Sequence, residues 1–176
     1  MPPSRLREAG KWTRQQQLDN ELLAAAERNS AASPDYCYPS RLDELLILQA
    51  ALAANPGDAR CAYYLGNLLY DRCRHSEAIS MWEHSAGLDP SFSVVWRNLG
   101  IGYFNVLNNA DASQSAFDKA LQANPGDARV LYERDQLWKR IGELPQRRLA
   151  ELKRFPDVVP LRDDLIARIA RDSILS

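Results

Sequence analysis

The sequence has few cysteines and no long apolar run. Its three cysteines, Cys37, Cys61 and Cys73, are an odd number without a paired spacing, so we expect no disulfide framework and a reducing compartment. No stretch approaches the roughly 18 consecutive apolar residues of a membrane-spanning helix, and charges occur throughout the N-terminal region. These absences predict a cytoplasmic protein.

An excess of charge of either sign is also missing. The 22 Lys and Arg residues nearly balance the 23 Asp and Glu residues, which gives a net charge of -1 and a pI of about 6.1. Such a chain carries no basic field that would attract nucleic acid or an anionic membrane. With 45% hydrophobic and 26% charged residues in 176, the composition is typical of a globular protein, and we predict a single domain over residues 1–176.

Motifs that carry chemistry are scarce. Glycine-rich phosphate loops and serine nucleophile elbows are missing. Cys73 and His75 lie close together between Arg72 and Glu77, and His84 follows, but there is no second Cys/His pair at the spacing of metal ligands. We therefore expect no metal, no cofactor and no catalytic site.

Apolar residues recur mostly at helical spacing, and strand-like alternation is almost absent, which predicts an all-helical chain. Within it a pattern repeats. The turn sequences NPGD (55–58), DPS (89–91) and NPGD (124–127) place Pro56, Pro90 and Pro125 at intervals of 34 and 35 residues. Between these turns a Leu-Gly pair returns at 65–66 and 99–100.

The repeated residues have a mechanical explanation. A glycine inside a helix costs about 1 kcal/mol relative to alanine, so we expect a neighbouring helix to press closely on Gly66 and Gly100. Trp82 and Phe117, at matching positions one helix later, are expected to fill the space between paired helices. Each proline ends one helix and begins the next turn.

This pattern resembles the tetratricopeptide repeat, a helix-turn-helix unit of about 34 residues. The resemblance implies an all-α fold, a right-handed superhelical solenoid of antiparallel helix pairs. The unit that matches best carries most signature positions, whereas the unit after it is degenerate and has Asp135 where glycine is expected. The predicted units are 11–56, 57–92, 93–127 and 128–160, followed by a terminal helix at 161–174.

Residues 36–170 also resemble the repeat region of large bacterial proteins that join tetratricopeptide repeats to an uncharacterised, mutarotase-like β-rich domain. The β-rich part does not occur in this sequence, so no carbohydrate chemistry is assigned to these residues. The resemblance nevertheless leaves an alternative function open, in which the chain is the helical scaffold of a larger bacterial carbohydrate-related enzyme or binding protein.

In tetratricopeptide repeats the first helix of each pair lines a concave groove that binds peptides or partner proteins. The resemblance thus implies a non-catalytic protein–protein interaction module. Its predicted groove mixes aromatic and cationic side chains, which are enriched at binding hot spots. The predicted groove residues are Arg60, Tyr63, Asn67, Tyr70, Arg97, Asn98, Ile101, Phe104, Arg129, Tyr132, Gln136 and Lys139.

Three interpretations of the groove stay open. Some proteins of this family clamp a carboxylate with five residues, and Asn67, Asn98 and Arg129 match three of them, whereas Tyr63 and Glu133 replace a lysine and an arginine. A more general groove for an acidic or C-terminal peptide is the second interpretation. In the third, several of these polar residues are solvated or pair with neighbouring acids.

The terminal helices allow a further alternative, self-association of the chain. Leu165, Ile166 and Ile169 follow one another at helical spacing near the C-terminus. They would be the interface residues of such an assembly.

Overall fold

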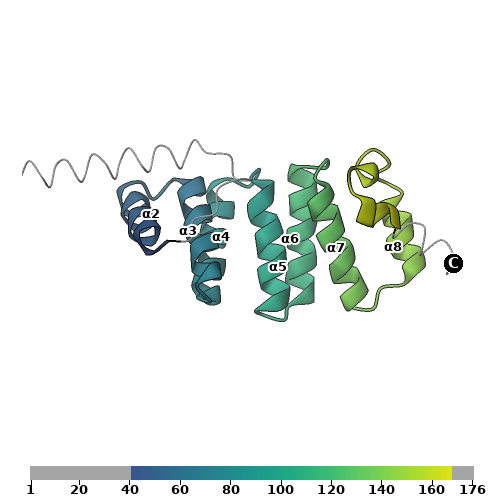
Figure 1. Cartoon of the computed structure of the whole chain (residues 1–176), viewed down its shortest axis with the longest axis horizontal. Coiled ribbons are helices and arrows are strands. Elements are labelled where there is room, and N and C mark those ends of the chain that lie inside the picture. The colour runs from purple at the N-terminus through teal and green to yellow at the C-terminus, as the bar shows by residue number, and fades with distance from the viewer. Residues whose placement is uncertain (1–40, 168–176) are drawn as a thin grey trace, which may run out of the picture. The chain divides into compact units, whose positions relative to one another are not determined.

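The computed structural model describes residues 41–167, and within that range the chain is helical without a strand. This confirms the predicted fold class at the level of secondary structure. Residues 11–40 of the first predicted unit, which include Cys37, and residues 168–174 of the predicted terminal helix lie outside the described residues. The elements are α2 (Leu42–Ala54), α3 (Ala59–Asp71), α4 (His75–Leu88), α5 (Ser93–Asn105), α6 (Ala110–Ala123), α7 (Ala128–Arg140), α8 (Pro145–Leu152) and the 3-10 helix η1 (Val159–Leu161), as Figure 1 shows.

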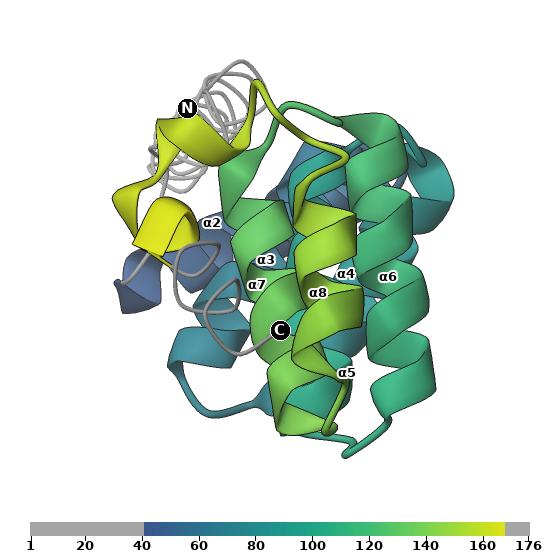
Figure 2. The ribbon, with the colours of Figure 1, turned by 90° about the vertical axis from the view of Figure 1, so that its right-hand side faces the viewer.

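The chain divides into two compact units at Leu88 and Asp89. The described part of unit 1 contains α2, α3 and α4, and that of unit 2 contains α5 to α8, η1 and a helical segment at 163–167. In unit 2, α5 packs against α6 and α7, and α7 also packs against α8 (Figure 2). The prediction of a single domain stays a prediction.

The repeated NPGD sequence forms the same turn in each unit. Asp58 caps α3, because its Oδ1 accepts hydrogen bonds from the backbone N–H groups of Arg60 and Cys61. Asp127 caps α7 in the same way. Each side chain satisfies N–H groups that have no partner within the helix. The last residue of each NPGD sequence is thus the signal that starts a helix.

The turns inside the helix pairs share another feature, one residue with a positive φ. Cys73 has φ 60° between α3 and α4, Asn108 has φ 51° between α5 and α6, and Gly142 has φ 83° between α7 and α8. This left-handed conformation commonly ends a helix, and glycine adopts it at the lowest cost. The spacing of the three turns repeats the period of the sequence.

Within each of the pairs α3/α4 and α5/α6, the two helices come into close contact at a glycine. A methyl group on Gly66 of α3 would lie 2.5 Å from Cδ1 and Nε1 of Trp82, and one on Gly100 of α5 would lie 2.9 Å from two ring atoms of Phe117. Trp82 and Phe117 are themselves buried. The prediction that neighbouring helices press on these glycines, with Trp82 and Phe117 filling the space, is confirmed.

We expect the substitution Gly66→Ala to lower the free energy of unfolding by about 1–3 kcal/mol, because the added methyl group overpacks the contact with Trp82. Gly87→Ala is the matched control. Gly87 lies near the end of α4 with no atom within 4 Å of an added methyl group, so alanine there is expected to raise the free energy by up to about 1 kcal/mol. Urea denaturation followed by circular dichroism measures both, and changes of the same sign would contradict the expectation.

The third pair replaces the glycine contact with a buried ion pair. Asp135 of α7 takes the glycine position, and Arg148 of α8 faces it with two hydrogen bonds, from Nε to Oδ1 at 2.8 Å and from Nη2 to Oδ2 at 2.9 Å. The side chains are only 3% and 6% exposed. Next to them, Arg134 bonds to Asp118 and Glu151. The Asp135–Arg148 ion pair therefore stands where the other two pairs have a ring on a glycine.

Removal of one partner of this buried pair is expected to be costly. Arg148→Met leaves the Asp135 carboxylate buried without its cation, which lowers the free energy of unfolding by about 3–5 kcal/mol. The double substitution Asp135→Ala/Arg148→Met removes the stranded charge, so we expect it to be less destabilising than Arg148→Met alone. Urea titrations of the three chains measure this, and a double variant less stable than the single one would refute the assignment.

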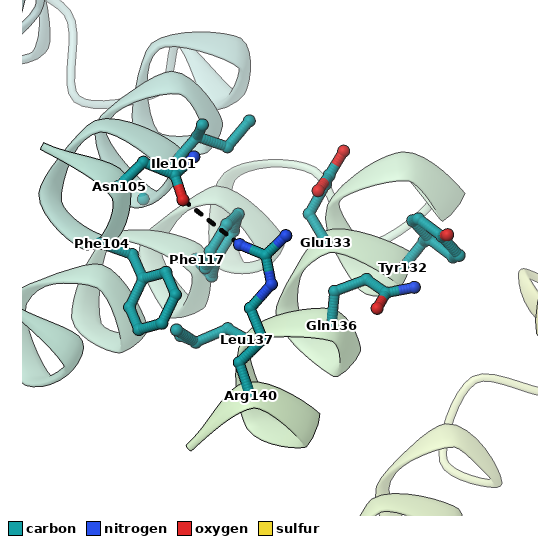
Figure 3. A pocket seen from close by; sticks show the side chains of 10 residues that line it. Ile101, Phe104, Asn105, Phe117, Tyr132, Glu133, Gln136, Leu137 and Arg140 are labelled. Carbon is teal, nitrogen blue, oxygen red and sulfur yellow. Dashed lines mark hydrogen bonds between the residues drawn. The ribbon is translucent and has the colours of Figure 1, made fainter. Parts of the chain in front are cut away.

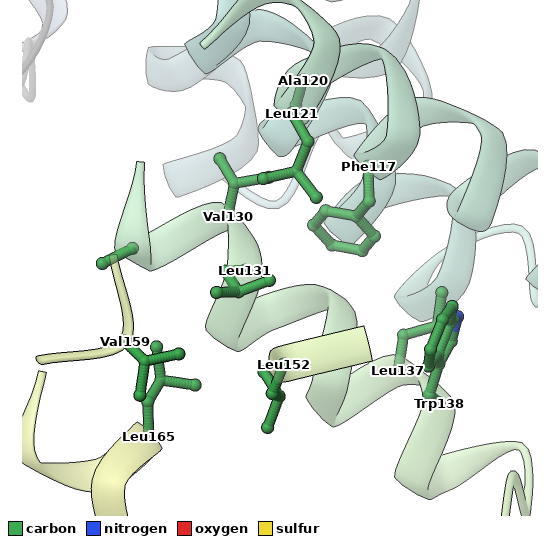
Figure 4. Packing of buried hydrophobic residues seen from close by; sticks show 11 residues of the cluster. Phe117, Ala120, Leu121, Val130, Leu131, Leu137, Trp138, Leu152, Val159 and Leu165 are labelled. Carbon is green, nitrogen blue, oxygen red and sulfur yellow. The ribbon is translucent and has the colours of Figure 1, made fainter. Parts of the chain in front are cut away.

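The core of unit 2 extends from α6 to the end of the described chain. Figure 4 shows Phe117, Leu131 and Leu152 in one apolar cluster with Val159 and Leu165. Leu165 is 0% exposed, so its prediction as an interface residue is wrong: it faces the core of its own unit. Ile166 is 46% exposed, and Ile169 lies outside the described residues.

Candidate functional site

Unit 2 contains a pocket between α5 and α7. Its volume is about 320 Å³, and its wall combines side chains from the two helices with Phe117 of α6 (Figure 3). In the tetratricopeptide arrangement, α5 and α7 are the first helices of two successive pairs, and the resemblance places the pocket on the side of these helices that lines the concave groove. The lining residues are Gly100, Ile101, Phe104, Asn105, Phe117, Tyr132, Glu133, Gln136, Leu137 and Arg140.

The apolar part of the wall is joined to the core. Phe117 and Leu137 belong to the buried cluster of unit 2, and Ile101, Phe104 and Tyr132 are half-buried and pack against that cluster. These side chains are therefore held in place by their own packing. A fixed apolar surface that stays partly open is suited to take up an apolar side chain of another molecule.

Arg140 supplies the positive charge of the pocket. Its Nη1 donates a hydrogen bond of 3.2 Å to Oδ1 of Asn105, and its guanidinium carbon lies 5.7 Å from the centre of the Phe104 ring. Figure 3 shows the side chain reaching from the end of α7 towards Asn105. Within residues 41–167 no carboxylate pairs with this guanidinium.

Glu133, the acid in the pocket wall, is shared with Arg97. Nη2 of Arg97 lies 3.4 Å from Oε1 of Glu133, and the two side chains are 23% and 30% exposed. Nε of Arg97 is buried and has no hydrogen-bond partner. The cation predicted for α5 is therefore already engaged with an acid of α7.

The structure brings together only some of the predicted groove residues. In unit 2, Ile101, Phe104, Tyr132 and Gln136 line the pocket. The other four of that unit do not line it: Arg97 pairs with Glu133, Arg129 lies 3.6 Å from Asp127, Asn98 is half-buried, and Lys139 is exposed.

The predicted residues of unit 1 are largely engaged within that unit. Tyr63 is only 2% exposed and packs against Tyr64. Asn67 accepts a hydrogen bond from Nε1 of Trp82, and the Tyr70 ring lies on Trp82 and on His75. Arg60 is exposed. Asn67 and Arg129, which match two positions of the carboxylate clamp, thus have protein partners, and Asn98, which matches a third, is not free either.

Sequence reasoning missed the end of the pocket. Asn105 follows Ile101 by four positions and Arg140 follows Gln136 by four, which places each on the same helix face as a predicted residue. One more helical turn on α5 and α7 would have identified both. Phe117 was assigned to the core, which is correct, but its ring also reaches the pocket wall.

The remaining reactive groups do not assemble into a site. Burial, and then the charge of Asp58, raise the pKa of the Cys61 thiol to about 11. The Cys61 sulfur also donates a hydrogen bond to the backbone oxygen of Leu48. Over residues 41–167 no three His, Cys, Asp or Glu side chains are grouped so as to hold a metal ion, and no helix is long and apolar enough to cross a membrane.

The two described cysteines are expected to differ strongly in reactivity. At pH 8 the raised pKa leaves about one Cys61 thiol in a thousand as thiolate, and burial shields it further, whereas Cys73 is exposed. Iodoacetamide labelling of the native chain followed by peptide mass spectrometry is expected to modify Cys73 and spare Cys61. Urea is expected to make both reactive, and rapid native labelling of Cys61 would contradict its burial.

No protein-family model matches the chain. Its fold is similar to that of MamA, with 18% identity and a TM-score of 0.63 over 73% of this chain and 74% of MamA. It is also similar to a chain of the APC/C hetero-tetramer Cut9-Hcn1, with 19% identity and a TM-score of 0.60 over 74% of this chain and 27% of that one.

Both similar proteins are tetratricopeptide-repeat proteins. Likeness at this level of identity concerns the fold, and the predicted all-α fold of the tetratricopeptide type is confirmed. The resemblance to a region next to a mutarotase-like domain stays a prediction.

Proposed function

We propose that this chain, which has the fold of tetratricopeptide-repeat proteins, is a non-catalytic scaffold that holds a segment of a partner protein between α5 and α7. The observation that carries the proposal is the pocket itself. Two successive first helices of unit 2 converge on an opening of about 320 Å³ that has an apolar wall and a polar rim.

The character of the wall supports a peptide rather than a small reactive substrate. Ile101, Phe104 and Leu137 offer an apolar contact surface, while the amides of Asn105 and Gln136 offer hydrogen bonds beside it. Protein interfaces combine an apolar centre with such a rim. An extended segment presents side chains and backbone polar groups in alternation, so it can use both kinds of contact.

The chemistry of the described residues supports a binding role. Glu133 is the carboxylate of the pocket wall, and Arg97 shares it. Catalysis by a pair of acids or by a nucleophile and a base requires a second reactive group within hydrogen-bonding reach, and the residues that line the pocket include no second carboxylate and no His, Cys, Ser, Thr or Lys. The cytoplasmic location and the absence of nucleic-acid and membrane partners remain part of this proposal.

The five-residue carboxylate clamp is not part of the proposal. Asn67 accepts a hydrogen bond from Trp82, Arg129 lies beside Asp127, and Glu133 takes the place of a clamp cation. These contacts favour the interpretation in which polar residues of the first helices pair with their own neighbours. Binding in unit 2 is therefore attributed to the pocket residues alone.

The substitution Gln136→Trp tests the proposal, because a large side chain at this position is expected to fill the pocket. Gln122→Trp is the matched control, since Gln122 is an exposed residue of α6 that does not line the pocket. In affinity capture from native lysate with quantitative mass spectrometry, the native chain and the control are expected to retain the same proteins. Gln136→Trp is expected to lose at least one of them about tenfold or more.

Circular dichroism and urea denaturation of the three chains serve as the folding control. If every protein retained by the native chain is retained equally by Gln136→Trp, the pocket is not the binding site and the proposal fails.

A further inference from the structure

We propose that Arg140 binds a carboxylate of the partner segment while an adjacent apolar side chain of that segment enters the pocket beside Phe104. This inference rests on the proposed function, because it assigns a ligand chemistry to the same pocket. It concerns a cation that is absent from the predicted groove residues and from the positions of the five-residue clamp.

The first argument is the state of the Arg140 guanidinium. Of its five N–H donors, one is directed to the neutral amide of Asn105, at 3.2 Å. No carboxylate within residues 41–167 neutralises its charge. The group lies over the Phe104 ring, and the Arg140 side chain is exposed, so an incoming ligand can reach it. A carboxylate that accepts two of the remaining N–H groups would form a charge-assisted pair, the strongest kind of hydrogen-bonded contact available here.

The second argument is that the neighbouring arginines already have acidic partners. Arg97 pairs with Glu133, and Arg129 lies beside Asp127. Arg162, which stacks on the ring of Tyr132 at 4.3 Å, forms two hydrogen bonds with Asp164. That contact raises the pKa of Arg162 and lowers the pKa of the Asp164 carboxyl. Among these four arginines, Arg140 is the one whose charge an incoming acid would neutralise.

Glu133 determines how the partner segment is oriented in the proposed contact. Its carboxylate lines the pocket as well, and Figure 3 shows it on the other side of the Arg140 guanidinium from Asn105. An acidic group of the partner is repelled there and attracted at Arg140. The partner segment is therefore expected to place its acid at the Asn105 end and its apolar side chain over the wall between the two helices.

Polar groups at the rim suit the backbone of such a segment. Oδ1 of Asn105 accepts from Arg140, which leaves the amide N–H₂ of Asn105 to donate to a peptide carbonyl. Gln136 offers both a donor and an acceptor on the facing helix. The pocket is therefore expected to bind a short extended segment in which an acidic group lies next to an apolar side chain.

Two display libraries of random peptides test the inference. In one, the displayed peptide has a free C-terminus, and in the other both ends are joined to carrier protein. Selection on the native chain is expected to enrich an acidic group next to an apolar residue. Enrichment of Asp or Glu in both libraries identifies a side-chain carboxylate, whereas enrichment confined to the free-ended library identifies the terminal carboxylate. Either result supports the inference.

Binding of the selected peptides is then measured by fluorescence anisotropy on two matched variants. Arg140→Gln and Lys139→Gln remove the same charge at neighbouring exposed positions, but Arg140 lines the pocket and Lys139 does not. We expect Arg140→Gln to weaken binding about tenfold or more and Lys139→Gln to change it less than about threefold. Arg140→Lys, which keeps the charge and loses the planar fork, is expected to fall between the native chain and Arg140→Gln.

The outcomes that overturn the inference differ from those that overturn the proposed function. If peptides are selected and Gln136→Trp abolishes their binding, but they lack an acidic preference or bind Arg140→Gln as tightly as the native chain, the carboxylate contact is wrong and the groove stands. If no peptide whose binding depends on Gln136 is selected from either library, the groove itself is wrong.

Discussion

Contact between an aromatic ring and a glycine of the preceding helix holds two of the described helix pairs together, α3 with α4 and α5 with α6. Trp82 on Gly66 and Phe117 on Gly100 let two backbones approach closely, and each ring is buried by that approach. In unit 2 the same contact has a second consequence. Phe117 reaches past Gly100 to the pocket wall, so the core contact that fixes α5 against α6 also shapes the surface that α5 presents towards α7. A change at Phe117 would therefore alter both the core packing and the pocket.

The third helix pair, α7 and α8, is held together by an ion pair in place of the ring–glycine contact. Asp135 and Arg148 occupy the place of the close contact and depend on each other, because removal of either would leave the other charge buried without its ion-pair partner. Arg134, Asp135 and Trp138 of α7 are buried, whereas residues 132, 133 and 136 line the pocket. The ion pairs of Arg134 and Asp135 and the buried apolar residues of α7 together set its rotation about its axis. That rotation decides which side chains line the pocket.

Much of the fold could be predicted from the sequence because the repeat fixes local structure and the partner of each element together. The interval between prolines identified helix pairs, and the Gly66 and Trp82 positions identified their contact. The site was less predictable, since its geometry depends on side chains that choose among several partners. Arg97 and Glu133 are 36 residues apart, and no periodicity indicates that they meet. Leu165 illustrates the opposite difficulty: its helical spacing is clear, but whether that face meets the core or another molecule depends on η1 and α8, which follow no repeat consensus.

The balance of charge in the chain has a consequence for recognition. A net charge of -1 produces little long-range attraction, so discrimination between partners must come from contacts at short range. Most arginines near the pocket are bound to acids of the same unit and contribute mainly to the position of the helices. Arg140 is different, because it lies over an aromatic ring and bonds only to an amide, so no carboxylate of the described residues offsets its charge. In the proposed contact, one such residue beside an apolar wall would distinguish an acidic segment from a neutral one, without the five-residue clamp that this sequence only partly matches.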